Sequence, residues 1–264
     1  GPILFQEREH MTTSVAAKSV RRDLYDQIAS IAQDPAALPF ADALKRVESC
    51  LETGECLLAA NACESLAKIT PDNPRLIQLW ALALARAGAA NKANGMMVKL
   101  AASEPPNEET LGLLARTYKD LWLQTGDREY LVLARDIYLN AYQLTKGSWS
   151  GINAATLALL SDDRDQGSQM ASSVLESLGP MNSMSEDGAQ GPAGDQVAAA
   201  SSGSQRYWDY ATMGEAALIL DRLDLAGWAY KNAIAICEGN LGNRASSKRN
   251  AELVLSVNSA AREL

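Results

Sequence analysis

Hydrophobic residues recur at helical spacing through the middle of the chain, from Asn107 to Leu160. Leucine, alanine and aromatic side chains return every three or four positions, the period of an amphipathic helix. The pattern is interrupted at Thr125–Asp127 and again at Lys146–Ser148. This stretch therefore predicts two helices joined by a short Gly-Asp turn, which form a hairpin, followed by a third helix at Ile152–Leu160.

Similar amphipathic segments flank this stretch on both sides. The helices predicted before it are Thr12–Gln33, Ala41–Leu51, Cys56–Ile69, Arg75–Ala87 and Asn91–Ala102, and those predicted after it are Arg164–Leu178, Tyr207–Leu220, Leu225–Cys237 and Ala245–Leu264. Pro and Gly residues or short polar turns separate most of them, as expected for helix ends. The pattern predicts an all-α fold.

A repeat period appears in these helices. Gly54 and Gly88, each between two predicted helices, are 34 residues apart. This is the period of the tetratricopeptide repeat, a helix-turn-helix unit that stacks on its neighbours. The first unit also has Ala59, a small residue suited to a close helix contact, and Pro71 at its end. We therefore predict a tetratricopeptide-type helical-hairpin solenoid, a right-handed superhelix of about five hairpins with an extra helix at each end.

The composition along the chain divides it into five parts. Residues 1–10 resemble a protease scar and a cloning junction, so we take Met11 as the native start. Residues 11–39 form an N-terminal helix, and residues 40–178 form the tetratricopeptide-like hairpins. Residues 179–205 are rich in Gly, Ser and Ala, which predicts a flexible loop inserted in the array. Residues 206–264 form the last hairpin and a C-terminal helix that caps the array with a polar face.

The charge of the chain limits its partners. Its formal net charge is -8, which argues against a nucleic-acid or anionic-membrane partner. No run approaches the roughly 18 apolar residues of a membrane span, and no secretory signal follows Met11. The four cysteines lie on helical faces without a Cys-x-x-Cys pair, which favours small buried residues in a reducing compartment. We expect a cytoplasmic protein.

The sequence shows no catalytic apparatus. Its one histidine, His10, lies in the segment that we regard as non-native, so histidine-based catalysis and histidine metal ligands are not expected. Neither a GxxxxGK[ST] nor a GxGxxG phosphate loop is present. We predict that the protein is not an enzyme and has no catalytic residue, metal site or cofactor.

Candidate binding residues lie on the first helix of each predicted hairpin, because these helices line the concave face of such an array. The polar and aromatic candidates are Arg75, Gln78, Arg116, Lys119, Asn153, Tyr207, Trp208, Asp209 and Glu215. Arg116 and Lys119 share one helical face and could bind a carboxylate or a phosphate. The alternative is that these side chains make salt bridges and hydrogen bonds between repeats.

An aromatic cluster opens the helix that follows the predicted loop. Tyr207, Trp208 and Tyr210 could anchor a partner peptide. The alternative is that Trp208 and Tyr210 pack in the core of their own hairpin. Adjacent helical residues cannot all point inward, so part of the cluster should be exposed or lie beneath the loop.

Three segments carry a family resemblance: Glu109–Trp122, Gly151–Leu160 and Tyr207–Leu220. They resemble bacterial tetratricopeptide-repeat proteins with a TRAF-binding-type region, which is similar to the central regulatory region of apoptosis signal-regulating kinases. The resemblance implies an all-helical regulatory array that is often one part of a larger signalling protein.

Two functions are consistent with these patterns. The preferred one is a non-enzymatic protein–protein interaction or regulatory module of a bacterial signalling protein, which binds a protein or peptide segment on its concave face. The alternative is a sensor that binds a small anionic ligand or nucleotide and controls a separate effector domain. The sequence is also compatible with a homo-oligomer. A peptide binder predicts an open groove along several repeats, whereas a sensor predicts one closed polar pocket near Arg116 and Lys119.

Overall fold

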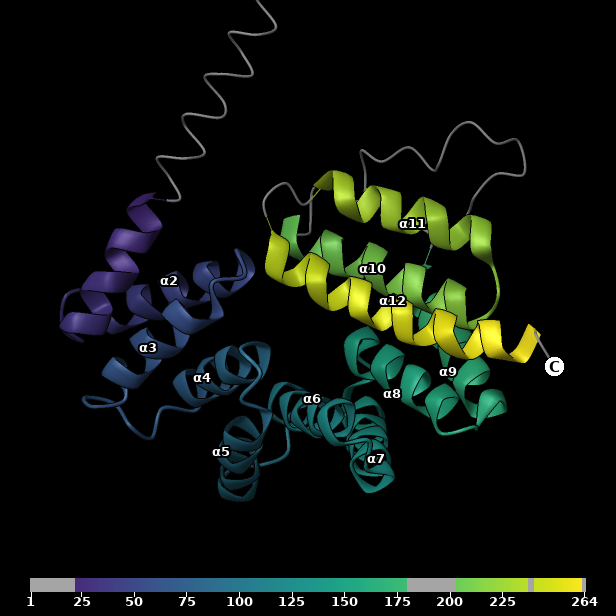
Figure 1. Ribbon diagram of the computed structural model, residues 1–264, viewed down its shortest axis with the longest axis horizontal. Helices are drawn as coiled ribbons and strands as arrows, with labels where there is room; N and C mark the ends of the chain where they lie inside the picture. Colours follow the sequence, from purple (N-terminus) through teal and green to yellow (C-terminus); the bar gives the residue numbers. More distant parts are fainter. Residues whose placement is uncertain (1–21, 180–202, 237–239, 263–264) are drawn as a thin grey trace, which may run out of the picture. The chain divides into compact units, whose positions relative to one another are not determined.

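The computed structural model describes residues 22–179, 203–236 and 240–262, and all regular secondary structure in these ranges is helical (Figure 1). A first helix covers residues 22–33. The helices that follow are α2 (Phe40–Glu52), α3 (Cys56–Leu66), α4 (Pro74–Arg86), α5 (Ala90–Ser103), α6 (Glu108–Thr125), α7 (Arg128–Thr145), α8 (Ser148–Leu160), α9 (Arg164–Ser177), α10 (Gly203–Ile219), α11 (Leu223–Ile236) and α12 (Leu241–Arg262). The predicted all-α fold is confirmed.

Some boundaries differ from those predicted. Helix α8 begins four residues before Ile152, and α12 begins at Leu241 rather than Ala245. Helix α10 begins at Gly203, inside the segment expected to be a loop. The remainder of that loop beyond Gly179, the expected non-native leader, the predicted start at Met11 and Cys237 lie outside the described residues.

The hairpin turns share one backbone feature. Gly54, Gly88 and Gly126 have φ values of 91°, 91° and 72°, in the left-handed region that glycine enters at little cost. The corresponding turns between α8 and α9 and between α10 and α11 place Asp162 and Asp221 there, with φ values of 68° and 58°. Aspartate tolerates this conformation better than most residues do. This turn therefore recurs along the described chain, and it is also formed where the turn has no glycine.

Side-chain caps begin four of these helices at the expected places. The side chains of Asn73 and Asn107 accept hydrogen bonds from backbone N–H groups of α4 and α6. Asp127 and Asp163 do the same for α7 and α9. Each cap satisfies a backbone donor that the first turn of a helix leaves unpaired.

The chain divides into two compact units, Gly1–Ala89 and Ala90–Leu264, called unit 1 and unit 2 below. The core of unit 1 is built from small and medium side chains, and Ala59, Cys50 and Cys63 are fully buried in it. Burial raises the pKa of the thiols of Cys50 and Cys63 to about 12, so both stay protonated near neutral pH. These two cysteines are therefore small core residues, as predicted.

Unit 2 contains α5 to α12, and three complete hairpins follow one another in it: α6/α7, α8/α9 and α10/α11. Their shared core includes Leu131 and Tyr138 of α7, Ile152 of α8 and Met213 of α10. The first helices of these hairpins are α6, α8 and α10, and they carry most of the candidate binding residues.

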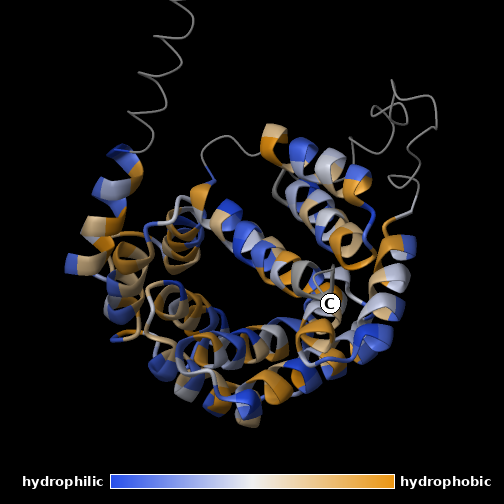
Figure 2. Ribbon diagram, turned by 45° about the vertical axis from the view of Figure 1, so that its right-hand side comes forward, coloured by the Kyte–Doolittle hydropathy of each residue, from blue (hydrophilic) through white to orange (hydrophobic). Residues whose placement is uncertain are grey.

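The C-terminal helix α12 lies along the hairpins of unit 2 and does not simply close their end. It packs against both α10 and α8, and it runs beside α10 in Figure 1. An end cap would contact the last hairpin only and would turn its polar face to solvent. Hydrophilic positions are frequent along α12 in Figure 2, but several of them face the hairpins. Ser247 and Asn258, for example, are buried.

Candidate functional site

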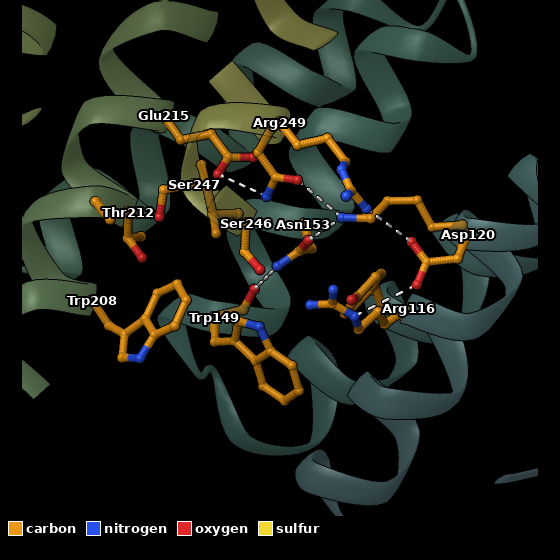
Figure 3. A pocket seen from close by; sticks show the side chains of 15 residues that line it. Arg116, Asp120, Trp149, Asn153, Trp208, Thr212, Glu215, Ser246, Ser247 and Arg249 are labelled. Carbon is orange, nitrogen blue, oxygen red and sulfur yellow. Dashed lines mark hydrogen bonds and ion pairs between the residues drawn. The ribbon is translucent and has the colours of Figure 1, made fainter. Parts of the chain in front are cut away.

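Helices α6, α8, α10 and α12 of unit 2 surround one polar pocket, shown in Figure 3. Its volume of about 50 Å³ gives room for a few water molecules or one small polyatomic ion. The lining residues are Arg116, Lys119 and Asp120 of α6, Tyr138 of α7, Trp149, Ile152 and Asn153 of α8, Trp208, Ala211, Thr212 and Glu215 of α10, and Ser246, Ser247, Arg249 and Asn250 of α12.

Helical spacing explains why these residues meet. On α6, Lys119 and Asp120 lie three and four positions after Arg116. On α8, Asn153 lies four positions after Trp149, and the lining residues of α10 and α12 follow the same spacing. Residues three or four apart share one face of a helix, so each helix turns a single face toward the pocket.

Lys119 lines the pocket and is almost completely buried. Its Nζ donates hydrogen bonds of 3.1 Å to Oδ1 of Asn153 and to Oδ1 of Asn250. Both partners are neutral amides, so neither balances the charge of the ammonium group. Burial, together with the nearby charge of Arg116, lowers the pKa of Lys119 to about 8. Lys119 is therefore mainly charged at pH 7 and titrates just above it.

Glu215 of α10 is the buried carboxylate of the pocket. Its Oε1 accepts a hydrogen bond of 2.5 Å from Oγ1 of Thr156, and its Oε2 accepts one of 3.1 Å from Nδ2 of Asn250. Burial raises the pKa of Glu215, and these hydrogen bonds together with the charge of Lys119 act in the opposite direction. The environment thus favours the neutral form of Glu215 more than water does.

Asp120 lies between two arginines but is not hydrogen-bonded to either. Its Oδ2 is 3.6 Å from Nε of Arg116, and its Oδ1 is 3.8 Å from Nη1 of Arg249. These distances exceed those of normal hydrogen bonds. Nε of Arg116 and Oδ2 of Asp120 are buried and have no hydrogen-bond partner among the described residues. Three cationic side chains thus face two carboxylates, and the pocket carries an excess of positive charge in an acidic chain.

Two tryptophans border the polar groups (Figure 3). The ring of Trp149 meets Tyr138 edge to face, with centroids 6.2 Å apart. It also lies directly against α6 at Gly112, where an added Cβ would collide with the indole ring. Trp208 packs edge to face on Tyr207, whose hydroxyl donates a 2.9 Å hydrogen bond to Oγ of Ser247. Trp208 therefore lines the pocket while Tyr207 fixes α12.

The structure brings five of the nine candidate residues together. The pocket-lining five are Arg116, Lys119, Asn153, Trp208 and Glu215. Tyr207 is buried but does not line the pocket. Asp209 does not line the pocket, and it accepts a 2.8 Å hydrogen bond from Nε2 of Gln205.

Two other candidates belong to unit 1 and form a separate set of contacts. Nη2 of Arg75 donates a 2.7 Å hydrogen bond to Glu48 of α2, and Nη1 donates one of 3.3 Å to Gln78. Arg75 thus links α4 to α2, as in the alternative interpretation that these side chains bond between repeats. Arg116, in contrast, pairs with Asp120 of its own helix, so this ion pair does not join two repeats.

Several pocket residues were not predicted from the sequence. Helical spacing could have indicated Asp120 and Trp149, because each lies four positions from a candidate residue on the same helix. Arg249 and Asn250 were not, because α12 was expected at the end of the array. Asn250 contacts Lys119 across 131 positions, and no local pattern indicates such a contact.

No group of three or more His, Cys, Asp or Glu residues in the described part of the chain is arranged to hold a metal ion. No described helix is long and apolar enough to cross a membrane.

The comparisons with known proteins agree with the fold. The family model described as "TPR-S: Tetratricopeptide Repeats-Sensor" matches residues 55–158. The crystal structure of TTC0263, a thermophilic TPR protein of Thermus thermophilus, superposes with a TM-score of 0.57 at 19% sequence identity. The alignment covers 81% of this chain and 98% of that one. The search of curated proteins gives no significant match. Fold and similarities together define a tetratricopeptide-type helical repeat protein.

Proposed function

We propose that unit 2 is a sensor module that binds a small anion in the pocket between α6, α8, α10 and α12. The observation that carries this proposal is the convergence of Arg116, Lys119 and Arg249 on a pocket with fewer carboxylates than cations. Arginine and lysine side chains of this kind bind phosphate or carboxylate groups through charge-assisted hydrogen bonds. Nε of Arg116 is a buried donor without a partner among the described residues, and it would gain one from the ligand.

The size of the pocket indicates what part of a ligand it takes. A volume of about 50 Å³ suits one phosphate, sulfate or carboxylate group. The remainder of a larger ligand, such as a nucleotide, would have to lie outside this space. One polar pocket near Arg116 and Lys119, rather than a groove along several repeats, is the feature expected of a ligand sensor, so the geometry favours the sensor.

The proposal for the wider role is supported by the similarities. A family model for repeat sensors matches the segment that contains α6 and nearly all of α8. We propose that the chain is a non-enzymatic regulatory module of a bacterial signalling protein, that it works in the cytoplasm, and that the ligand controls a separate effector domain. The TRAF-binding-type resemblance of Glu109–Trp122 and Tyr207–Leu220 supports a regulatory role, because both segments supply pocket residues.

Calorimetric titration of the full chain with inorganic phosphate tests this function. The variant Arg249→Ala removes a cation whose side chain is 52% exposed, so the fold should survive. The matched control is Lys248→Ala, which removes a 77% exposed cation of the same helix outside the pocket. We expect Arg249→Ala to weaken phosphate binding about tenfold or more, as for loss of one charge-assisted contact, and Lys248→Ala to leave it unchanged. Equal weakening by both variants would show that binding is only a non-specific charge effect.

Partner recognition is the second candidate function. Tetratricopeptide repeats generally mediate protein–protein interactions, which agrees with the fold. In unit 2 the faces of α8 and α10 already hold a helix, namely α12. This surface is therefore suited to a helical segment, but a partner there would have to replace α12. Binding of a synthetic peptide of residues 241–262 to a chain that ends before α12 would support this function.

A further inference from the structure

We propose that α12 is a ligand-dependent clamp, in which an anion bound between Arg116 of α6 and Arg249 of α12 ties the C-terminal helix to the hairpins. The proposal rests on the anion-binding function given above. It adds the consequence of binding: occupancy of the pocket is converted into immobilisation of α12, the element through which a following segment would sense the ligand.

The first observation is that polar contacts provide much of the attachment of α12. Ser247 bonds to Tyr207, Asn250 bonds to Lys119 and Glu215, and Nδ2 of Asn258 donates a 2.9 Å hydrogen bond to the carbonyl oxygen of Leu218. Within residues 241–258, Val254 is the one large apolar side chain that is fully buried. The core of α6 to α11 buries many more. Because apolar burial is the dominant favourable term in folding, α12 should open at a lower free energy than its neighbours.

The second observation is the position of the cations. Arg116 and Arg249 approach the two oxygens of Asp120 from different helices, at 3.6 and 3.8 Å. Asp120 thus connects α6 to α12 only through contacts longer than hydrogen bonds. A phosphate or sulfate ion offers several acceptor oxygens and can bond to both guanidinium groups.

Thermodynamic linkage gives the sign of the effect. An anion that contacts both arginines has its full set of contacts only when α12 is docked, so it shifts the population toward the docked helix. A ligand too large for the pocket with α12 docked would act in the opposite direction, because it would bind better when α12 has moved away. Slower or faster opening of α12 on binding therefore separates a clamp from a displaced helix.

The experiment is hydrogen–deuterium exchange of the full chain with and without inorganic phosphate, read separately for α3, α8, α10 and α12. Without phosphate, we expect α12 to exchange faster than α8 and α10. With saturating phosphate, amide exchange in α12 should slow at least threefold more than exchange in α3. The comparison with α3 corrects for the general stabilisation of proteins by this ion. Arg249→Ala should abolish the slowing, and Lys248→Ala should retain it.

The outcomes distinguish this proposal from the function on which it rests. Phosphate binding without slower exchange in α12, or with faster exchange, overturns the clamp and leaves the anion site intact. Exchange of α12 as slow as that of α8 and α10 without phosphate also overturns the clamp. Absence of phosphate binding by calorimetry overturns the anion site, and the clamp with it.

Discussion

Nζ of Lys119 on α6 donates a 3.1 Å hydrogen bond to Oδ1 of Asn250 on α12, across 131 positions of the chain. The amide nitrogen of the same asparagine donates to Glu215 of α10. One neutral side chain thus bonds to both a buried amine and a buried carboxyl group. The same hydrogen bonds therefore line the pocket and attach α12 to the hairpins. A change in the pocket should affect the attachment of α12, and a change in the attachment should affect the pocket.

Asn250→Ala should destabilise unit 2. The variant removes one hydrogen bond each from Lys119 and Glu215, and loss of one partner of a buried polar group costs about 1–3 kcal/mol. Chemical denaturation, followed by circular dichroism, measures the change. The control is Ser256→Ala, an exposed position of α12, for which we expect less than about 0.5 kcal/mol. Equal stability of the two variants would mean that the Asn250 bridge contributes nothing.

The affinity for sulfate should fall as the pH rises through about 8. Lys119 has its pKa lowered to about 8 and loses its positive charge above that value, whereas the sulfate charge is constant over this range. A bound anion favours protonated Lys119, so the midpoint in the complex should lie above 8. Titrations with sulfate at pH 6.5, 7.5, 8.5 and 9.5 measure the effect.

Lys119→Arg is the control for this pH dependence, because arginine stays charged throughout the range. Its affinity should vary less with pH than that of the unchanged chain. The stability of the chain without a ligand should instead rise with pH. The unfolded chain binds more protons at Lys119 than the folded chain does between pH 8 and 10.5, so this lysine makes stability rise with pH there. An affinity that does not change with pH would exclude Lys119 from anion binding.

Gly112→Ala should disturb the pocket through Trp149. An added Cβ would overlap the indole ring, so Trp149 or α6 must move. We expect a loss of about 1–3 kcal/mol from overpacking, together with a shift in tryptophan fluorescence and weaker phosphate binding. Gly95→Ala is the matched control on helix α5, where an added Cβ meets nothing within 4 Å. That variant should be stabilised by about 0.5–1 kcal/mol. Similar effects of the two substitutions would contradict the predicted role of Gly112.

The sequence predicts the helices well because their apolar period and turn residues are local properties. Gly54 and Gly88 indicate the repeat, and both have the left-handed backbone that such a turn needs. The grouping of Arg116, Lys119 and Asn153 also follows from helical spacing on two adjacent first helices. What the sequence does not show is where α12 docks, since its polar residues suit solvent as well as a polar pocket. The sequence also does not distinguish Arg75 from Arg116, because each lies on the first helix of a predicted hairpin. In the structure the two residues lie in different units.

Ala59→Leu tests the close helix contact of the first repeat in unit 1. Ala59 is fully buried on α3, in a core that also contains Val47 and Cys50 of α2. A leucine side chain has no space there and should cost about 1–3 kcal/mol, measured as a lower midpoint in thermal unfolding. Asn61→Leu introduces the same side chain at an exposed position of α3 and should change stability by less than about 0.5 kcal/mol. If Ala59→Leu left the midpoint unchanged, α2 and α3 would not meet at Ala59, and the assignment of this residue as the small contact of the repeat would be wrong.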